Sequence, residues 1–91
     1  MKKMFKIGKV INYYEKIGIT IVKLSAPLSV GDKIKFYKDG ELILYQQIER
    51  IIMNQKNIPF ANSKDVVALV LDEKVQKGSE VYKTSQLGTS S

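Results

Sequence analysis

The residues best suited to chemistry are lysines and tyrosines near the start of the chain. Lys33 and Lys35 alternate with apolar residues, and on a strand this places both ammonium groups on one face about 7 Å apart, which suits successive phosphates of a nucleic acid. Tyr13 and Tyr14 are adjacent, so at least one ring points outward, where it could stack on a base or contact a partner. The competing interpretation is an ordinary solvated strand surface.

The net charge of +6 is unevenly distributed along the chain. Residues 1–38 contain nine lysines and two acids, whereas residues 39–91 contain six basic and seven acidic residues. This asymmetry favours a basic face for a polyanion, although a lysine-rich soluble surface would give the same composition. We expect the lysines of the first three strands and their turns to converge on one side of the domain: Lys9, Lys16, Lys23, Lys33 and Lys35.

The residue types exclude most catalytic mechanisms. The chain has no cysteine and no histidine, which removes disulfides, thiolate nucleophiles, the usual zinc ligands and the usual general base. Asp72 and Glu73 are the only adjacent acids, and they lie in a predicted turn. No glycine-rich run ends in Lys-Ser or Lys-Thr, as a P-loop requires. We predict a protein that is not an enzyme and that uses no cofactor and no metal.

Strand signals dominate the chain, because β-branched and aromatic residues alternate with polar ones between Gly, Asp, Asn and Pro. No convincing amphipathic helix is present. The predicted strands are residues 5–14, 17–25, 33–36, 42–53, 66–71 and 80–83. Six short strands and no helix predict an all-β fold, a small six-stranded antiparallel Greek-key β-barrel, because closure removes exposed strand edges.

Several of these segments carry further detail. The apolar phase of the second strand shifts at Val22, which predicts a bulge there. Asp39 and Gly40 predict a type I′ hairpin. Residues 42–53 are apolar on both faces, so this strand is either buried on both sides or bent part way. The continuous apolar run 66–71 predicts a central, well-covered strand.

These patterns also define the expected core and domain limits. Residues 1–84 should form one barrel domain, and residues 85–91 a disordered C-terminal tail. No stretch resembles a signal peptide or approaches the roughly 18 apolar residues of a membrane span, so we expect a cytoplasmic protein. The expected core consists of Ile7, Val10, Ile19, Ile21, Leu24, Leu28, Ile34, Phe36, Ile48, Val67, Leu69, Leu71 and Val81.

Three separated signatures resemble the second-domain barrel of elongation factor Tu. They are the turn-and-strand segment 28–34, the pair Ile48-Glu49, and the closing segment 75–83. Over residues 7–83, with Ile-Gly-Lys-Val at 7–10, Tyr-Tyr at 13–14 and Lys-Ile-Gly at 16–18, the chain is similar to stand-alone translation elongation factor-like proteins. It is similar there also to the C-terminal barrel of collagenase-like peptidases.

The resemblance implies a contact with RNA. Several of the collagenase-like peptidases are implicated in RNA modification, and Ile48-Glu49 matches the motif that lines the pocket for the terminal adenosine of aminoacyl-tRNA in elongation factor Tu. It implies a shallow site in which the Glu49 stem packs on a base while Arg50 or a nearby lysine meets the phosphate. The competing interpretation is a solvated strand edge.

Two functional hypotheses follow. The first is a non-catalytic, translation-factor-like barrel that binds RNA, either tRNA or rRNA, through its basic face. The second is a protein-interaction module that docks on a translation GTPase or an RNA-modifying enzyme. Neither hypothesis involves a membrane. The identity of the partner, any preference for an RNA sequence, and the oligomeric state are left open by the sequence.

Overall fold

A computed structural model describes residues 2–86, and all regular secondary structure within this range is β-strand. Six strands have five or more residues and correspond to the six predicted ones. They are β1 (Lys2–Tyr14), β2 (Ile19–Leu24), β4 (Lys33–Lys38), β5 (Glu41–Gln47), β9 (Val66–Val70) and β10 (Glu80–Gln86). The short strands are β3 (Leu28–Ser29), β6 (Ile51–Met53), β7 (Lys56–Ile58) and β8 (Phe60–Ala61).

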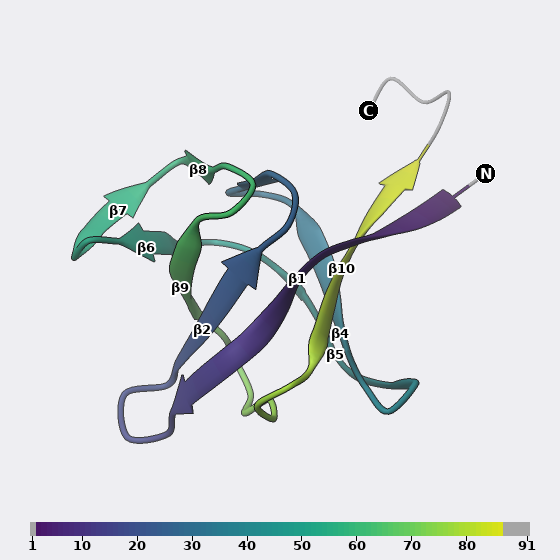
Figure 1. Ribbon diagram of the computed structural model, residues 1–91, viewed down its shortest axis with the longest axis horizontal. Coiled ribbons are helices and arrows are strands. Elements are labelled where there is room, and N and C mark those ends of the chain that lie inside the picture. The colour runs from purple at the N-terminus through teal and green to yellow at the C-terminus, as the bar shows by residue number, and fades with distance from the viewer. Residues whose placement is uncertain (1, 87–91) are drawn as a thin grey trace.

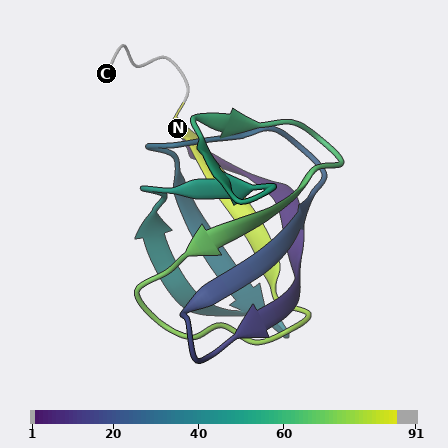
Figure 2. The same ribbon diagram turned by 90° about the vertical axis from the view of Figure 1, so that its left-hand side faces the viewer.

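Eight strands form one antiparallel sheet in the order β5-β4-β10-β1-β2-β9-β6-β7, and β3 pairs with β8. The last long strand, β10, inserts between β1 and β4, so strands far apart in sequence become neighbours (Figure 1). The sheet curls round on itself, as Figure 2 shows. The all-β, antiparallel barrel predicted from the sequence is confirmed.

Two register shifts lie in the first long strand and a third in the β4–β5 pair, whereas β2 alternates without interruption, so the prediction of a bulge in the second strand is wrong. The β1 register shifts between Lys6 and Gly8 against β10, and between Val10 and Asn12 against β2. The pairing of β2 with β9 is unbroken. Because a bulge bends its strand and increases the local twist, the two shifts in β1 contribute to the curvature of the sheet.

The inward face of β2 differs from the prediction. Val22 and Leu24 are buried with Thr20, whereas Ile19 and Ile21 are only half-buried. Because β2 alternates without interruption, the burial of Val22 forces both isoleucines to the outer face. Their assignment to the core is wrong for this reason.

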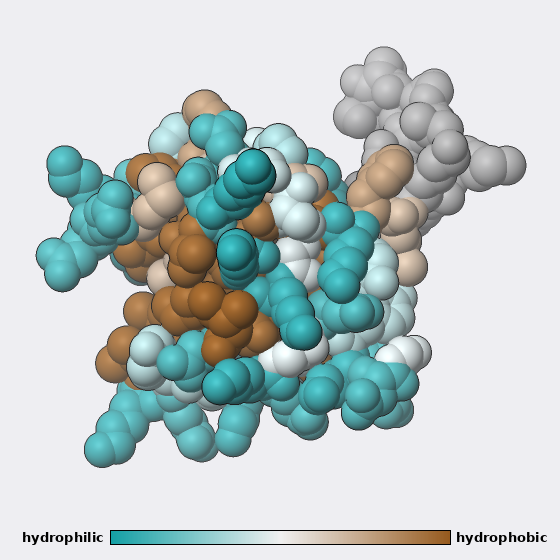
Figure 3. Space-filling model, viewed as in Figure 1, coloured by the Kyte–Doolittle hydropathy of each residue, from teal (hydrophilic) through white to brown (hydrophobic). Residues whose placement is uncertain are grey.

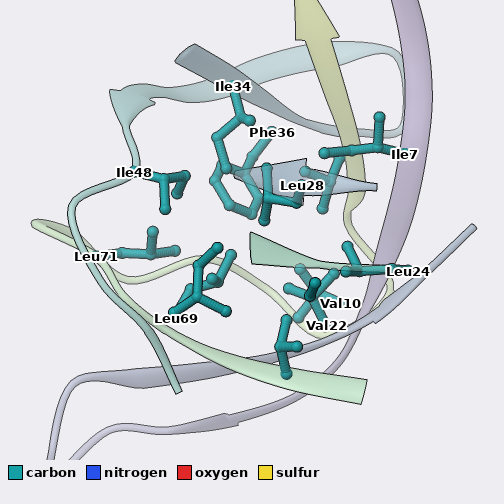
Figure 4. Close-up of a cluster of buried hydrophobic side chains, with 14 of the residues drawn as sticks. Ile7, Val10, Val22, Leu24, Leu28, Ile34, Phe36, Ile48, Leu69 and Leu71 are labelled. Atoms are coloured by element: carbon teal, nitrogen blue, oxygen red, sulfur yellow. The ribbon is translucent and has the colours of Figure 1, made fainter. Parts of the chain in front are cut away.

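The barrel interior is otherwise as expected. Every other predicted core residue is buried, and Phe36 is the largest of the fully buried side chains. Figure 4 shows it among Ile34, Leu28 and Ile48. The predicted core lacked these buried apolar residues: Val22, Ile51, Ala61 and Val75.

The predicted long strand 42–53 is bent, which decides between the two alternatives. β5 ends at Gln47, residues 48–50 form no strand, and β6 begins at Ile51. The prediction of a well-covered 66–71 strand is half right. β9 is central in the sheet and buries Val67 and Leu69, but Val66 remains exposed.

The turn and terminal predictions have mixed outcomes. Asp39 and Gly40 both have positive φ angles, 55° and 80°, as a type I′ turn requires. β10 continues to Gln86, which pairs with Lys2, so the strand extends two residues beyond the predicted domain boundary at 84. The remainder of the predicted tail lies outside the described residues.

A tight turn at Gly31 and Asp32 connects three parts of the barrel. Gly31 N–H donates to the Ile48 carbonyl at 2.7 Å, and Ile48 N–H donates to the Asp32 carbonyl at 2.8 Å. The Asp32 carboxylate accepts a bond from Ser29 N–H at 2.8 Å and lies 3.5 Å from the Lys83 ammonium. Gly31 has a φ of 97°, a conformation that favours glycine. This turn therefore ties β3 and β4 to the bend after β5 and to β10.

The side chain of Gln46 makes a second connection, between β5 and the end of β9, which are not paired as strands. Its Nε2 donates to the Val70 carbonyl at 3.3 Å, and its Oε1 accepts from Asp72 N–H at 2.8 Å. Gln46 thus joins β5 to the end of β9, where a side-chain amide takes the place of strand pairing.

Replacing Gly8 with alanine should destabilise the barrel. A Cβ at this position would lie 2.7 Å from the Lys23 carbonyl oxygen and 2.9 Å from Val22 Cγ1, so β1 and β2 would have to move apart. We expect Gly8→Ala to lower the free energy of unfolding by about 1–3 kcal/mol in urea denaturation. Ser25→Ala is the control, because Ser25 is exposed and follows Leu24, the β2 residue opposite Gly8. This variant should unfold like the original protein. Equal stability of the two variants would show that the strands are not in tight contact.

Removing the Asp32 carboxylate should also weaken the fold. Asp32→Ala leaves Ser29 N–H without its acceptor, and the half-buried Lys83 ammonium keeps only its bond to the Pro27 carbonyl. We expect a loss of about 1–2 kcal/mol in the free energy of unfolding. Glu73→Ala, in an exposed turn, is the matched control. If both variants unfolded at the same urea concentration as the original protein, the carboxylate would have no part in holding the turn.

Candidate nucleic-acid interface

Three lysines meet around a shallow hollow over β1 and β2. Lys9 and Lys23 are directly opposite each other in the β1–β2 pairing, and both are exposed. Lys6 joins them in lining the hollow, whose floor includes Gly8. Gly8 itself is buried, and a side chain there would point inward to Val22, so the hollow lies over closely packed backbone of β1 and β2. Lys6 was not among the predicted site residues.

The next group of cations lies two strands away on β4. Ile34 and Phe36 are buried, so the alternating Lys33 and Lys35 lie on the outer face, as predicted. The Lys35 ammonium lies 5.5 Å from the centre of the Tyr45 ring on β5. This distance is within the range of a cation–π contact.

Strand β10 separates the two lysine groups and contributes Glu80 and Tyr82 to the outer face. Lys6 Nζ donates to Glu80 at 3.1 Å, and the Tyr82 hydroxyl donates to the same carboxylate at 3.2 Å. The Tyr82 ring meets Tyr37 edge to face, with ring centres 5.4 Å apart. These contacts hold the aromatic side chains in fixed orientations.

These contacts also change two pKa values. The hydrogen bond from Lys6 and its positive charge lower the pKa of Glu80 below its usual 4.5. Loss of contact with water, followed by the hydrogen bond to Glu80, raises the pKa of Tyr82 above its usual 10.0. At neutral pH, Glu80 is therefore a carboxylate already paired with a lysine, and Tyr82 is a neutral phenol.

Other predicted site residues lie elsewhere. Lys16 is in the turn between β1 and β2, apart from the lysines on the strands. Tyr13 is half-buried and packs against the core, whereas Tyr14 is exposed and lines an apolar hollow. The structure thus gathers Lys9 with Lys23, and Lys33 with Lys35, but it does not bring Lys16 or the tyrosine pair to them.

Glu49 and Arg50 are exposed in the bend between β5 and β6. Arg50 Nη2 donates to the Asn57 side-chain oxygen on β7 at 3.4 Å. Ile48 beside them is fully buried. The adenosine pocket implied by the resemblance remains a prediction for this bend.

An apolar hollow occupies the outer face of β2, β6 and β9. Figure 3 shows hydrophobic side chains gathered over β2 and β9, at the left of the view. Ile17 is 65% exposed at its rim, and Val66 is 45% exposed. Ile19 and Ile21, which point outward from β2 and not into the core, also line this hollow.

The fold defined above is a small antiparallel β-barrel, and solved structures share it. Two crystal structures of the C-terminal domain of a protein assigned to the U32 peptidases from Geobacillus thermoleovorans, one a selenomethionine variant, match with TM-scores of 0.78 and 0.77. Their sequence identities are 20% and 19%, over 86% and 85% of this chain and 90% and 96% of theirs. At this level of identity the likeness concerns the fold alone.

A relative in sequence is an uncharacterized protease of Methanocaldococcus jannaschii. It is 25% identical over 80 residues, which cover 88% of this chain and 20% of that protease. The chain therefore spans about a fifth of its relative's length. No family model matches the sequence.

These likenesses support one part of the resemblance inferred from the sequence. The C-terminal barrel of collagenase-like peptidases shares the fold of this chain. The identification with stand-alone translation elongation factor-like proteins stays a prediction. Across residues 2–86, no helix is long and apolar enough to cross a membrane.

Removing the Lys6 charge should raise the pKa of Glu80 toward 4.5, because Lys6 is the main cause of its lowering. Lys6→Met keeps most of the side chain, and NMR titration of the Glu80 carboxylate measures the change. Lys23→Met is the control and should leave the Glu80 titration unchanged. Since the folded-state pKa is below the unfolded one, the pairing stabilises the fold above pH 4.5 and is lost as the pH falls through the folded value. An unaltered pKa in Lys6→Met would rule out the pairing in solution.

Proposed function

We propose that this barrel is a non-catalytic module that binds RNA, of the tRNA or rRNA class, through one face of its sheet. We call this surface the lysine face. It is formed by the outer sides of β2, β1, β10 and β4, and its lysines are Lys6, Lys9, Lys23, Lys33 and Lys35.

One observation carries the proposal. Among the described side chains that these four strands direct outward, five are lysines and one, Glu80, is acidic. The excess comes from β1, β2 and β4, and β10 brings β1 and β4 onto one surface because it lies between them. Concentrated positive charge of this kind attracts the phosphate backbone of a nucleic acid and releases its bound counterions.

The single acid does not offset this charge. Glu80 accepts hydrogen bonds from Lys6 and from the Tyr82 hydroxyl, so its charge is partly satisfied within the face. Lys9, Lys23 and Lys33 make no ion pair with any described residue, and their ammonium groups are free to contact phosphates. The face therefore presents several available cations on rigid strands.

Reversing two charges of the lysine face should weaken RNA binding. Lys9→Glu with Lys23→Glu changes the directly paired lysines of β1 and β2. We expect about tenfold weaker binding, or more, and a salt slope smaller by about 1 for each lysine that had met a phosphate. Fluorescence anisotropy with a labelled tRNA at several salt concentrations measures both quantities.

The matched control changes the same net charge at two lysines away from this face. Lys56→Glu with Lys74→Glu alters β7 and the exposed turn after β9, and its binding should fall only slightly. Equal losses in the two double variants would mean that net charge alone attracts the RNA. In that case the lysine face would not be the binding site.

The apolar hollow favours a second candidate function, docking on another protein. Its exposed Ile17 and Val66 add apolar surface of the kind that protein interfaces bury. The similar barrels described above belong to longer proteins, in which they are one domain. We propose as the occupant a folded domain of an RNA-modifying enzyme or a translation GTPase, covalently linked or separate.

Salt dependence separates the two candidates. Binding to RNA through several lysines should weaken steeply with ionic strength, with a slope of about −0.7 per phosphate contact for single strands. An apolar contact through the hollow should hardly respond to salt. From β2, the lysine face extends toward β1, whereas the apolar hollow extends toward β9 on the other side. One barrel can therefore combine the two functions.

A further inference from the structure

Two tyrosines and two lysines alternate across the outside of four neighbouring strands. In the sheet register, Lys6 of β1 is opposite Tyr82 of β10, and Tyr82 is opposite Lys35 of β4. Lys35 is in turn opposite Tyr45 of β5. The result is a continuous row, Lys6–Tyr82–Lys35–Tyr45, which we call the cross-strand row.

All four side chains of the row lie on the outer face. Ile7, Val81, Ile34 and Phe36 are fully buried on the same strands, so their sequence neighbours Lys6, Tyr82 and Lys35 face outward. Tyr45 shares that face, because the Lys35 ammonium lies over its ring.

The two rings are held differently and both remain accessible. Tyr82 is fixed by its hydrogen bond to Glu80 and by the edge-to-face contact with Tyr37, and it is half-buried. Tyr45 is 53% exposed, and the Lys35 ammonium lies over its ring. An exposed aromatic ring beside a lysine contributes little to the core, whereas it suits a planar ligand with a nearby negative charge.

A hollow next to Tyr82 provides space for such a ligand. It is lined by Tyr82 and Tyr37 with Met4, Gly40 and Glu80. The Tyr37 hydroxyl donates to the Met4 sulfur at 3.7 Å, so one side of the hollow is sulfur and aromatic carbon. Glu80 supplies a carboxylate that can accept hydrogen bonds from the edge of a base.

The spacing of the row selects the form of the nucleic acid. Neighbouring strands are about 4.8 Å apart, so the two rings are separated by roughly 10 Å, with the Lys35 position between them. Bases can reach separate rings only when they are unstacked from one another, as in single strands. In an RNA duplex the faces of the bases are covered, and only the backbone and groove edges are available.

We infer that the cross-strand row binds single-stranded RNA, with bases stacked on Tyr82 and Tyr45 and phosphates held by Lys6 and Lys35. This inference rests on the proposed RNA-binding function and specifies the form of RNA that the lysine face recognises. A single strand would cross β1, β10, β4 and β5 at a steep angle, meeting a cation and a ring in turn.

The test compares a labelled, unstructured 12-nucleotide RNA with the same strand annealed to its complement, by fluorescence anisotropy at fixed salt. The single strand should bind at least about tenfold more tightly than the duplex. Tyr45→Leu and Tyr82→Leu should each weaken single-strand binding about tenfold, because each removes one stacking platform. Tyr45→Phe and Tyr82→Phe keep the rings and should bind like the original protein.

Phe60→Leu is the matched control, because Phe60 is an equally exposed aromatic residue, 54% exposed, on β8 outside the row. It should leave binding unchanged. Tyr45 is the more secure test position, since its exposed side chain can be shortened without opening the core, and thermal unfolding of each variant verifies its fold.

The outcomes distinguish this inference from the function on which it rests. Duplex binding as tight as single-strand binding, or leucine variants that bind like the original protein, would overturn the role of the row. If the charge reversals at Lys9 and Lys23 still weakened binding in that case, the proposed function would stand. An original protein that bound neither form of RNA would overturn both.

Discussion

The barrel depends on the hydrogen bonds that the Gly31–Asp32 turn exchanges with Ile48. The main sheet begins with β5 and ends with β7, so its two edges must be joined by something other than a regular ladder. The turn's two backbone bonds with Ile48 hold the end of the β4–β5 pair, and the Gln46 amide joins β5 to the end of β9 with two more. These bonds keep the sheet curled around Phe36, with a mostly apolar interior that also contains Thr20 and Ser79.

Much of the fold could be predicted, because alternation and turn residues act locally. The Asp39-Gly40 hairpin needs only its own two residues, and the bend before β6 was one of two options that the sequence allowed. The phase of β2 could not be predicted in this way. Ile19 and Ile21 outweigh Thr20 in any count of apolar residues, yet Thr20 is inside. The phase is set by pairing with β9 and by the bulged β1, which are contacts between distant parts of the chain.

The part of the candidate site that lies on a single strand could be predicted from the sequence. Lys33 and Lys35 follow from alternation alone, whereas the cross-strand row does not. Lys6 and Tyr82 are 76 positions apart in sequence and meet only through the register of β1 with β10. The adjacent tyrosines at 13 and 14 were the stronger local signal, but one packs on the core and the other lines the apolar hollow. A binding surface assembled across strands therefore leaves little trace in a single sequence.

The pairing of β1 with β10 has a mechanical consequence. Lys2 lies opposite Gln86, so the two ends of the described chain leave the barrel side by side (Figure 1). In an antiparallel pair the hydrogen bonds are perpendicular to the strands, and tension applied between these two ends would load them one after another, as in a zipper. Such a barrel yields to a small pulling force at its ends, while force applied along the strands would have to break many bonds together. The pair that joins the lysine-bearing strands is therefore also the place where a pulling machine, such as an unfolding protease, would open the domain first.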